Sequence, residues 1–421
     1  MKILLQKVFI QDENSKHNQS VKDILIEDDK IISIENNIEK HNADKIIHFP
    51  ETVAANGFVD CFANFCDPGF EFKETIETGS AAAALGGYTQ VFVLPNTQPV
   101  IQTKAQVEYV LQKSNSLPVT VYPVGAVSKN IEGKDLAEMY DMFKSGAIAF
   151  SDGLQPLQNS GLLLKALQYI KAFNGIIIQQ PIDKSIGTYG LMNEGIISTR
   201  MGLQAIPAIG EEIIIQRDIN LLRYTKSKLH ITGISTAKGL QLVKQAKAEG
   251  LNITCSVTPY HLFFCDEDLQ DYDTNLKVNP PLRSKKDMIA LREEVMNGTV
   301  DMIASHHFPQ HSDKKNCEFE YAENGIIGLQ TAFAAVNNVL PNLSTPQLTN
   351  LLGNNARKIF NLPSTKIEVG NEAEITLFNR KEKTILQEKN IKSKSFNSPF
   401  INKNLNGKII GTIYKKNISI N

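Results

Sequence analysis

Cys66, Asp152 and the adjacent pair His306 and His307 are residues of metal-ligating type. Three such side chains from separate segments can hold one zinc ion and leave a position open for water, which is the arrangement used for metal-assisted hydrolysis. Neighbouring residues on a strand face opposite ways, so both histidines cannot easily be aimed at one ion. The candidate ligands of a single zinc are therefore Cys66, Asp152 and His306. We prefer the competing interpretation, that these residues have structural roles, because scattered His and Cys are usually packing or surface residues.

These residues belong to segments that read as strands and strand ends. Gly57–Asp60 is a buried strand that opens into the loop Asp67–Gly69, and a helix with the small-residue run Ala81–Ala84 follows. A second strand, Gln90–Leu94, ends in Pro95, Asn96 and Thr97. A strand–loop–helix–strand unit is the repeat of a parallel α/β barrel, whose chemistry lies where the strands end.

The middle of the chain repeats this alternation, which predicts an α/β fold with a (β/α)8 TIM-type barrel. Both ends read as short strands, with Asp28 and Asp29 as a hairpin signal, so they should form one small β-sandwich-like domain from discontinuous pieces. The predicted division is 1–52 and 365–421 for the small domain and 53–364 for the barrel. Further predicted barrel strands are 119–123, 147–150, 175–179, 228–231, 252–257 and 302–305, and predicted helices are 133–145, 160–173, 209–225 and 237–249.

Composition excludes several classes of protein. The chain has 421 residues, of which 42% are hydrophobic, and a formal net charge of −1, so nothing indicates a nucleic-acid partner. No apolar run reaches the ~18 residues of a membrane span. The N-terminus suits a first strand better than a signal peptide. Five scattered cysteines without a close-spaced pair indicate reduced thiols and a cytoplasmic protein.

The sequence resembles the dihydroorotases, the cyclic amidohydrolases of pyrimidine biosynthesis. The family pattern D-x-H-x-H-x-R-x-P-G at the first barrel strand is matched by Asp60, Pro68 and Gly69, whereas Phe62, Asn64 and Cys66 stand at its three working positions. The resemblance covers almost the whole chain. Other matching stretches are Met192–Gly195, Leu229–Ile231, Ser235–Thr236, Asp271–Asn275, Lys277–Arg283, Gly325–Leu329 and Asn397–Phe400.

The resemblance implies two zinc ions that activate a hydroxide for attack on the amide carbon of dihydroorotate. It also implies which positions should hold them: four histidines and an aspartate that is both ligand and general base. All five are replaced here, by Phe62, Asn64, Gln180, Gly233 and His306. The bridging ligand falls within Phe150–Gly153, where the role of Asp152 stays open. The arginine and the last histidine, which hold substrate, are replaced by Cys66 and Gln310.

Asn96 and Asn279 match asparagines that contact dihydroorotate in the family. They would be the remnant of a substrate-binding site, and a pocket for some other small molecule could persist around them. The preferred alternative is that they satisfy backbone groups at strand ends, which every barrel requires.

We therefore expect a dihydroorotase-like protein of pyrimidine biosynthesis that lacks the zinc site and is catalytically inactive. No cofactor is expected. The resemblance extends to inactive dihydroorotase-like chains that assemble with aspartate transcarbamoylase, which implies such a complex or a homo-oligomer. Phe62 is expected to fill the volume that the metals vacate. The alternative is a hydrolase of cyclic amides with a rebuilt site, which is either metal-free or holds one zinc.

Overall fold

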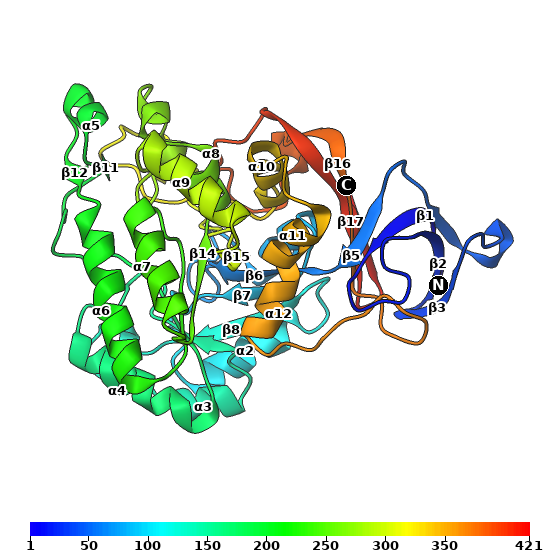
Figure 1. Cartoon of the computed structure of the whole chain (residues 1–421), viewed down its shortest axis with the longest axis horizontal. Helices are drawn as coiled ribbons and strands as arrows, with labels where there is room; N and C mark the ends of the chain where they lie inside the picture. The colour runs from blue at the N-terminus through cyan, green and yellow to red at the C-terminus, as the bar shows by residue number, and fades with distance from the viewer.

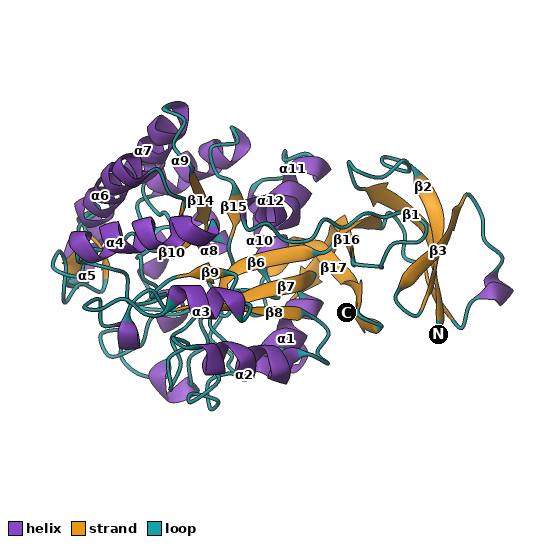
Figure 2. Ribbon diagram, turned by 90° about the horizontal axis from the view of Figure 1, so that it is seen from below, coloured by secondary structure: helices purple, strands orange, loops and turns teal.

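The computed structural model describes residues 1–421 and shows a parallel barrel joined to a β-rich domain built from both ends of the chain (Figure 1). The predicted fold class is thereby confirmed. Figure 2 shows the helices covering the outside of the barrel, with the terminal strands to one side. None of the helices combines the length and apolar character needed to cross a membrane.

The barrel has eight parallel strands that neighbour one another in chain order. Its edges meet where Ala63 pairs with His307 and the Asn64 N–H donates to the His307 carbonyl at 2.8 Å, so the barrel is nearly closed. The last strand therefore lies beside the first, and their ends share one site. The strands are β6 (Phe58–Ala63), β7 (Tyr88–Val93), β8 (Thr120–Gly125), β9 (Ala149–Phe150), β10 (Ile177–Gln179), β13 (Leu229–Ile231), β14 (Ile253–Val257) and β15 (Met302–Ile303).

Helices connect the strands and bury their apolar faces against them. Several begin at a capping side chain, as where the Thr236 hydroxyl accepts the Gly239 N–H and the Asn159 side chain accepts the Leu162 N–H. The helix predicted from Gly133 begins only at Met139, because Gly133 has φ +70° and lies in a turn. The connecting helices are α1 (Ile76–Leu85), α2 (Lys104–Ser114), α3 (Met139–Lys144), α4 (Ser160–Ile170), α6 (Ile209–Thr225), α7 (Ala237–Ala248), α9 (Lys285–Met296) and α10 (Ala332–Val339).

Smaller elements lie at the carboxyl ends of the barrel strands and cover the opposite end of the barrel. A small two-stranded sheet precedes α6 in the chain. A π-helical turn at Asn350–Asn354 joins two short helices. These elements are β11 (Met192–Asn193), α5 (Ile196–Met201), β12 (Ala205–Ile206), α8 (Pro259–Phe263), α11 (Thr345–Thr349) and α12 (Asn355–Ile359).

The terminal strands form one sheet in the order β18-β17-β16-β5-β1-β2-β3, with β4 beside β1, and have their own core of 16 buried apolar residues. The hairpin at Asp28–Asp29 joins β2 to β3 as expected. The predicted domain boundaries stay a prediction, although β5 pairs with this sheet and not with the barrel. The strands are β1 (Lys2–Gln11), β2 (Val21–Glu27), β3 (Lys30–Glu35), β4 (Lys45–Ile47), β5 (Val53–Asn56), β16 (Ile375–Ile385), β17 (Asn404–Tyr414) and β18 (Asn417–Ile420).

One buried ion pair connects the sheet to the barrel. The Glu374 carboxylate, directly before β16, accepts hydrogen bonds from Thr89 Oγ1 at 2.5 Å, from Gln90 Nε2 at 3.0 Å and from the Arg357 guanidinium. Arg357 also donates to the Gly57 carbonyl at 3.0 Å. These contacts join the start of β16 to barrel strand β7 and to Arg357 of α12.

Candidate functional site

The carboxyl ends of the barrel strands enclose almost no free volume. Phe62 lies there at 1% exposure, and its ring stacks on the His306 ring with 4.4 Å between centroids and 29° between planes. The cavity that remains, which Gln180, Tyr260, Asn279 and other residues also line, has about 20 Å³. That volume admits about one water molecule.

His306 belongs to a chain of buried hydrogen bonds across the barrel interior. Its Nε2 lies 2.8 Å from Thr232 Oγ1, which lies 2.8 Å from Ser256 Oγ, which in turn lies 3.0 Å from His230 Nε2. Burial lowers the pKa of both His306 and His230 to about 3, so both rings are neutral at neutral pH. His261 Nε2 approaches the Pro280 carbonyl at 3.1 Å, and burial lowers its pKa to about 4.

Gly233 makes room for the His306 ring. A Cβ atom at Gly233 would lie 2.5 Å from His306 Cε1, and the backbone there has φ +71°, a conformation that favours glycine. The imidazole thus occupies space that any side chain at position 233 would need. Two of the replaced ligand positions are therefore coupled: His306 requires the glycine, and the glycine leaves the gap that His306 fills.

Asn64 and Gln180, at two further replaced positions, serve the local backbone. Asn64 Oδ1 accepts the Cys66 N–H at 2.9 Å, and Gln180 Nε2 donates to the Asn279 carbonyl at 2.9 Å. Both residues are buried and both line the small cavity. Their polar groups stabilise loops instead of presenting a set of ligands.

The structure does not assemble Cys66, Asp152 and His306 into a metal site. Asp152 Oδ1 accepts the N–H groups of Val127 and Ser128, each at 2.9 Å, and its other oxygen accepts the Ser128 hydroxyl. Burial raises the pKa of Asp152 to about 6 against these hydrogen bonds. Burial also raises the pKa of the Cys66 thiol to about 12, and a protonated thiol is a poor ligand. No group of three His, Cys, Asp or Glu side chains anywhere in the chain could hold a metal ion.

Asn96 connects the loops that follow β7 and β9. Its Nδ2 donates to the Asp152 carbonyl at 3.2 Å, and its Oδ1 accepts the Leu154 N–H at 3.1 Å. A side chain at Gly153 would collide with this amide. Asn96 thus satisfies backbone groups at strand ends, the interpretation that the sequence favoured. Asn279 does line the small cavity, and its backbone carbonyl is held by Gln180.

His307 and Glu74 form a buried pair that the sequence did not indicate. His307 Nδ1 accepts the Gly328 N–H at 3.2 Å, which leaves Nε2 to donate to the Glu74 carboxylate at 3.2 Å. Burial would raise the pKa of Glu74, but hydrogen bonds from His307, Ser393 and Thr78 outweigh it and hold the pKa below its usual range. This pair ties the last barrel strand to the loop before α1, so His307 has a structural partner.

A second buried network gathers residues from several of the stretches that carry the family resemblance. The Glu211 carboxylate accepts the N–H and hydroxyl groups of Ser235 and Thr236. Arg283 donates to Ser235 Oγ at 3.0 Å and to Asn193 Oδ1 at 3.2 Å. These motif residues are fully engaged in holding loops together at the strand ends.

Comparisons with known proteins agree with the motifs. Residues 52–239 match the family model described as Dihydro-orotase-like. A dihydroorotase from Acetivibrio thermocellus is 39% identical over 408 residues, which cover 96% of both chains, and one from Syntrophus aciditrophicus is 38% identical over 422 residues, which cover 99% of both. This chain belongs to the dihydroorotase family.

Solved structures support the fold of this dihydroorotase-family chain. The L-hydantoinase (dihydropyrimidinase) from Arthrobacter aurescens superposes with a TM-score of 0.85 at 23% identity, over 99% of this chain and 95% of that one. A D-hydantoinase superposes with a TM-score of 0.84 at 17% identity. The barrel and its terminal β-rich domain are thus an architecture shared with amidohydrolases.

The residues at the strand ends do not fit the two zinc ions that the family resemblance implies. Phe62 has no donor atom, Gly233 has no side chain, and the amides of Asn64 and Gln180 are hydrogen-bonded to backbone. His306 could ligate through nitrogen, but Phe62 and Gly233 are its immediate neighbours. No metal-dependent step can be derived from this donor set.

The coupling of Gly233 to His306 predicts the stability of one variant. Gly233→Ala should lower the free energy of unfolding by about 3 kcal/mol, from overpacking against His306 and strain at positive φ. Gly250→Ala is the matched control: it has φ +80° and no atom within 4 Å of a built Cβ, so it should cost only about 1 kcal/mol. Urea unfolding measures both. Equal losses would contradict the packing described here.

The buried histidines predict lower stability in mild acid. An unfolded imidazole titrates near pH 6.5, whereas folded His230 and His306 titrate near pH 3 and His261 near pH 4. Between those limits each of these histidines binds more protons in the unfolded chain, so each lowers the free energy of unfolding by about 1.4 kcal/mol per pH unit as pH falls. The buried Asp152 carboxyl, with a pKa of about 6, acts in the opposite direction. Above about pH 6.5 these histidines are neutral in both the folded and the unfolded chain, so they no longer lower the free energy of unfolding.

Urea unfolding between pH 7.5 and pH 5 tests this dependence. His306→Gln should make the pH dependence shallower by about one proton, because glutamine cannot titrate. His41→Gln, which removes an imidazole at an exposed site, is the matched control. If His306→Gln and the unchanged chain have the same slope, His306 is not buried in a neutral form.

Proposed function

We propose that this member of the dihydroorotase family does not hydrolyse dihydroorotate and acts as a structural partner of aspartate transcarbamoylase. The observation that carries the first half is the packing of Phe62 against His306, which leaves a cavity of about 20 Å³. Pockets for small organic ligands are typically about 300–1,000 Å³. A six-membered ring bearing a carboxylate has no space at these strand ends.

The chemistry of the lining also favours an inactive protein. Water with a pKa near 15.7 is not ionised at neutral pH, so hydrolysis needs a metal or a general base. The general-base position holds His306, which is neutral but hydrogen-bonded to Thr232 and covered by Phe62. The positions that would hold the substrate carboxylate carry Cys66 and Gln310, and neither bears a positive charge.

The alternative function is a cyclic amide hydrolase with a rebuilt site. It requires Phe62 to move away and Cys66, Asp152 and His306 to converge on one zinc. The hydrogen bonds of Asp152 to Val127 and Ser128 weigh against that movement. The mononuclear form of this alternative predicts about one zinc per chain together with turnover, and the metal-free form predicts turnover without zinc. Both are separable from the proposal by experiment.

The purified chain should release no dihydroorotate hydrolysis product above background and should contain no stoichiometric zinc. The variant Phe62→His with Asn64→His should remain inactive, because positions 180, 233 and 306 still lack their ligands. Absorbance assays and elemental analysis measure both quantities, with the Acetivibrio thermocellus dihydroorotase as the positive control. Turnover in the unchanged chain, or one zinc lost on changing Cys66 or His306, would favour the rebuilt site.

The partner half of the proposal rests on the family resemblance and on the integrity of the fold. The loop networks around Glu211 and Glu74 are complete although the ligand positions are not, so the chain keeps an ordered surface. A barrel without a catalytic mouth can still present that surface to another protein. Aspartate transcarbamoylase is the partner that inactive dihydroorotase-like chains imply.

Co-expression with aspartate transcarbamoylase should give a complex that co-elutes in size-exclusion chromatography. When this chain is omitted, the transcarbamoylase should be less active or should fail to assemble fully. A monomeric chain beside a fully active, correctly assembled transcarbamoylase would reject the structural role. The hydrolysis and zinc measurements above then decide separately whether a catalytic role replaces it.

A further inference from the structure

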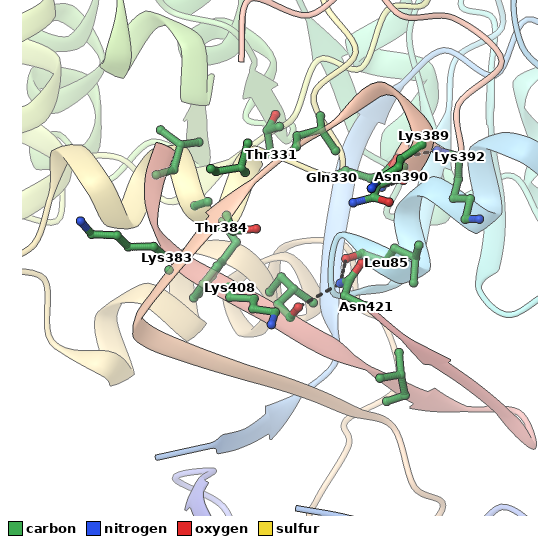
Figure 3. Close-up of a pocket in the computed structure, with 18 residues that line it drawn as sticks. Leu85, Gln330, Thr331, Lys383, Thr384, Lys389, Asn390, Lys392, Lys408 and Asn421 are labelled. Atoms are coloured by element: carbon green, nitrogen blue, oxygen red, sulfur yellow. Dashed lines mark hydrogen bonds between the residues drawn. The ribbon is translucent and has the colours of Figure 1, made fainter. Parts of the chain in front are cut away.

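A hollow of about 470 Å³ lies on the flank of the barrel, away from the filled strand ends. Its walls are the β16–β17 hairpin, the start of α10, the end of α1 at Leu85, and Ile420 and Asn421 at the end of the chain. Figure 3 labels Leu85 and Asn421 beside each other. It is far larger than the cavity beside Phe62, and its volume is within the range of small-molecule sites. Nothing in the proposed function uses it.

The charged side chains that line the hollow are all positive. They are Lys383, Lys389, Lys392 and Lys408, and no aspartate or glutamate side chain lines it. Lys408 is paired with Glu382 at 2.6 Å, whereas the other three form no ion pair. In Figure 3, Lys389 and Lys392 lie near each other at one end, beside Gln330. Three of the four lysines thus have no acidic side chain within ion-pair distance, in a chain whose net charge is −1.

Part of the accessible lining of the hollow is apolar. It comes from Ile385, which is exposed, and from Leu386 and Ile420, which are partly exposed. Lysine ammonium groups are mobile point charges suited to phosphate or carboxylate groups. Apolar side chains beside such groups suit a ligand with an apolar body and an anionic end.

The walls are held by specific hydrogen bonds, so the hollow is built before any ligand arrives. Gln330 Nε2 donates to the Asn390 carbonyl at 3.0 Å, and its Oε1 accepts the Lys392 N–H at 2.8 Å, which fixes the lysine-bearing segment. Where the β16–β17 pairing is interrupted, buried Asn337 donates to the carbonyls of Arg380 and Asn406. Such preorganisation lowers the cost of ligand binding.

We propose that this hollow binds an organic anion that has a flat apolar body and at least two negative charges. The body lies against Ile385, Leu386 and Ile420. The charged groups lie between Lys389 and Lys392 at one end. Since the lysines are largely exposed, the attraction is partly screened by salt, and binding weakens as ionic strength rises.

Calorimetric titration of the full chain with 2-naphthyl phosphate tests the proposal at pH 8, where this probe is a dianion. One molecule should bind per chain, and 2-naphthol and inorganic phosphate should each bind more weakly. Lys389→Gln with Lys392→Gln should weaken binding of the probe about tenfold, because each exposed charge pair contributes modestly. Gln330→Ala should also weaken binding, because the segment that carries these lysines is then released.

Lys129→Gln with Lys165→Gln is the matched control: it removes the same charge from exposed positions outside the hollow, and binding should be unchanged. Circular dichroism establishes that each variant is folded. The proposal is overturned if the probe does not bind at millimolar concentration. It is equally overturned if both double variants weaken binding alike, or if inorganic phosphate binds as tightly as the probe, since either result indicates only non-specific charge attraction.

Discussion

The contact of Phe62 with His306, with Gly233 behind it, is the constraint on which the state of the strand ends depends. The phenyl ring is buried at the strand ends, and the imidazole occupies the space that a side chain at Gly233 would take. Thr232, Ser256 and His230 then complete the hydrogen bonds that a neutral buried imidazole requires. The strand ends are therefore packed core, and close packing there contributes to stability.

The stretches that carry the family resemblance and the positions that depart from it have different physical roles in this chain. Ser235, Thr236, Asn193 and Arg283 join the network around Glu211, where removal of one partner would leave buried charge uncompensated. Phe62, Asn64 and Gln180 line only the small cavity, where apolar packing or a backbone hydrogen bond is sufficient. The fold therefore needs the residues of the Glu211 network, whichever residues stand at positions 62, 64 and 180.

Much of the fold could be predicted from the sequence because its signals are local. Alternation of apolar strands with amphipathic helices indicated the barrel, and Asp28–Asp29 indicated a hairpin, since both follow from short-range periodicity and turn chemistry. The helix expected from Gly133 was too long, because its first turn is replaced by a loop with Gly133 at positive φ. The positions at which this chain departs from the family's ligand pattern could be identified one at a time from the motifs. Their coupling was not, because positions 233 and 306 meet only in the folded chain.

The lysine-lined hollow could not be predicted from the sequence either. Lys383, Lys389, Lys392 and Lys408 follow no motif, and Gln330, which orients the segment between two of them, is distant in the sequence. Their convergence comes from the β16–β17 hairpin crossing α10, a contact held by Asn337. Since the hairpin belongs to the terminal sheet and α10 to the barrel, the hollow lies where sheet and barrel meet. Its walls contain none of the residues that fill the strand ends, so the packing of Phe62 against His306 places no restriction on what the hollow can bind.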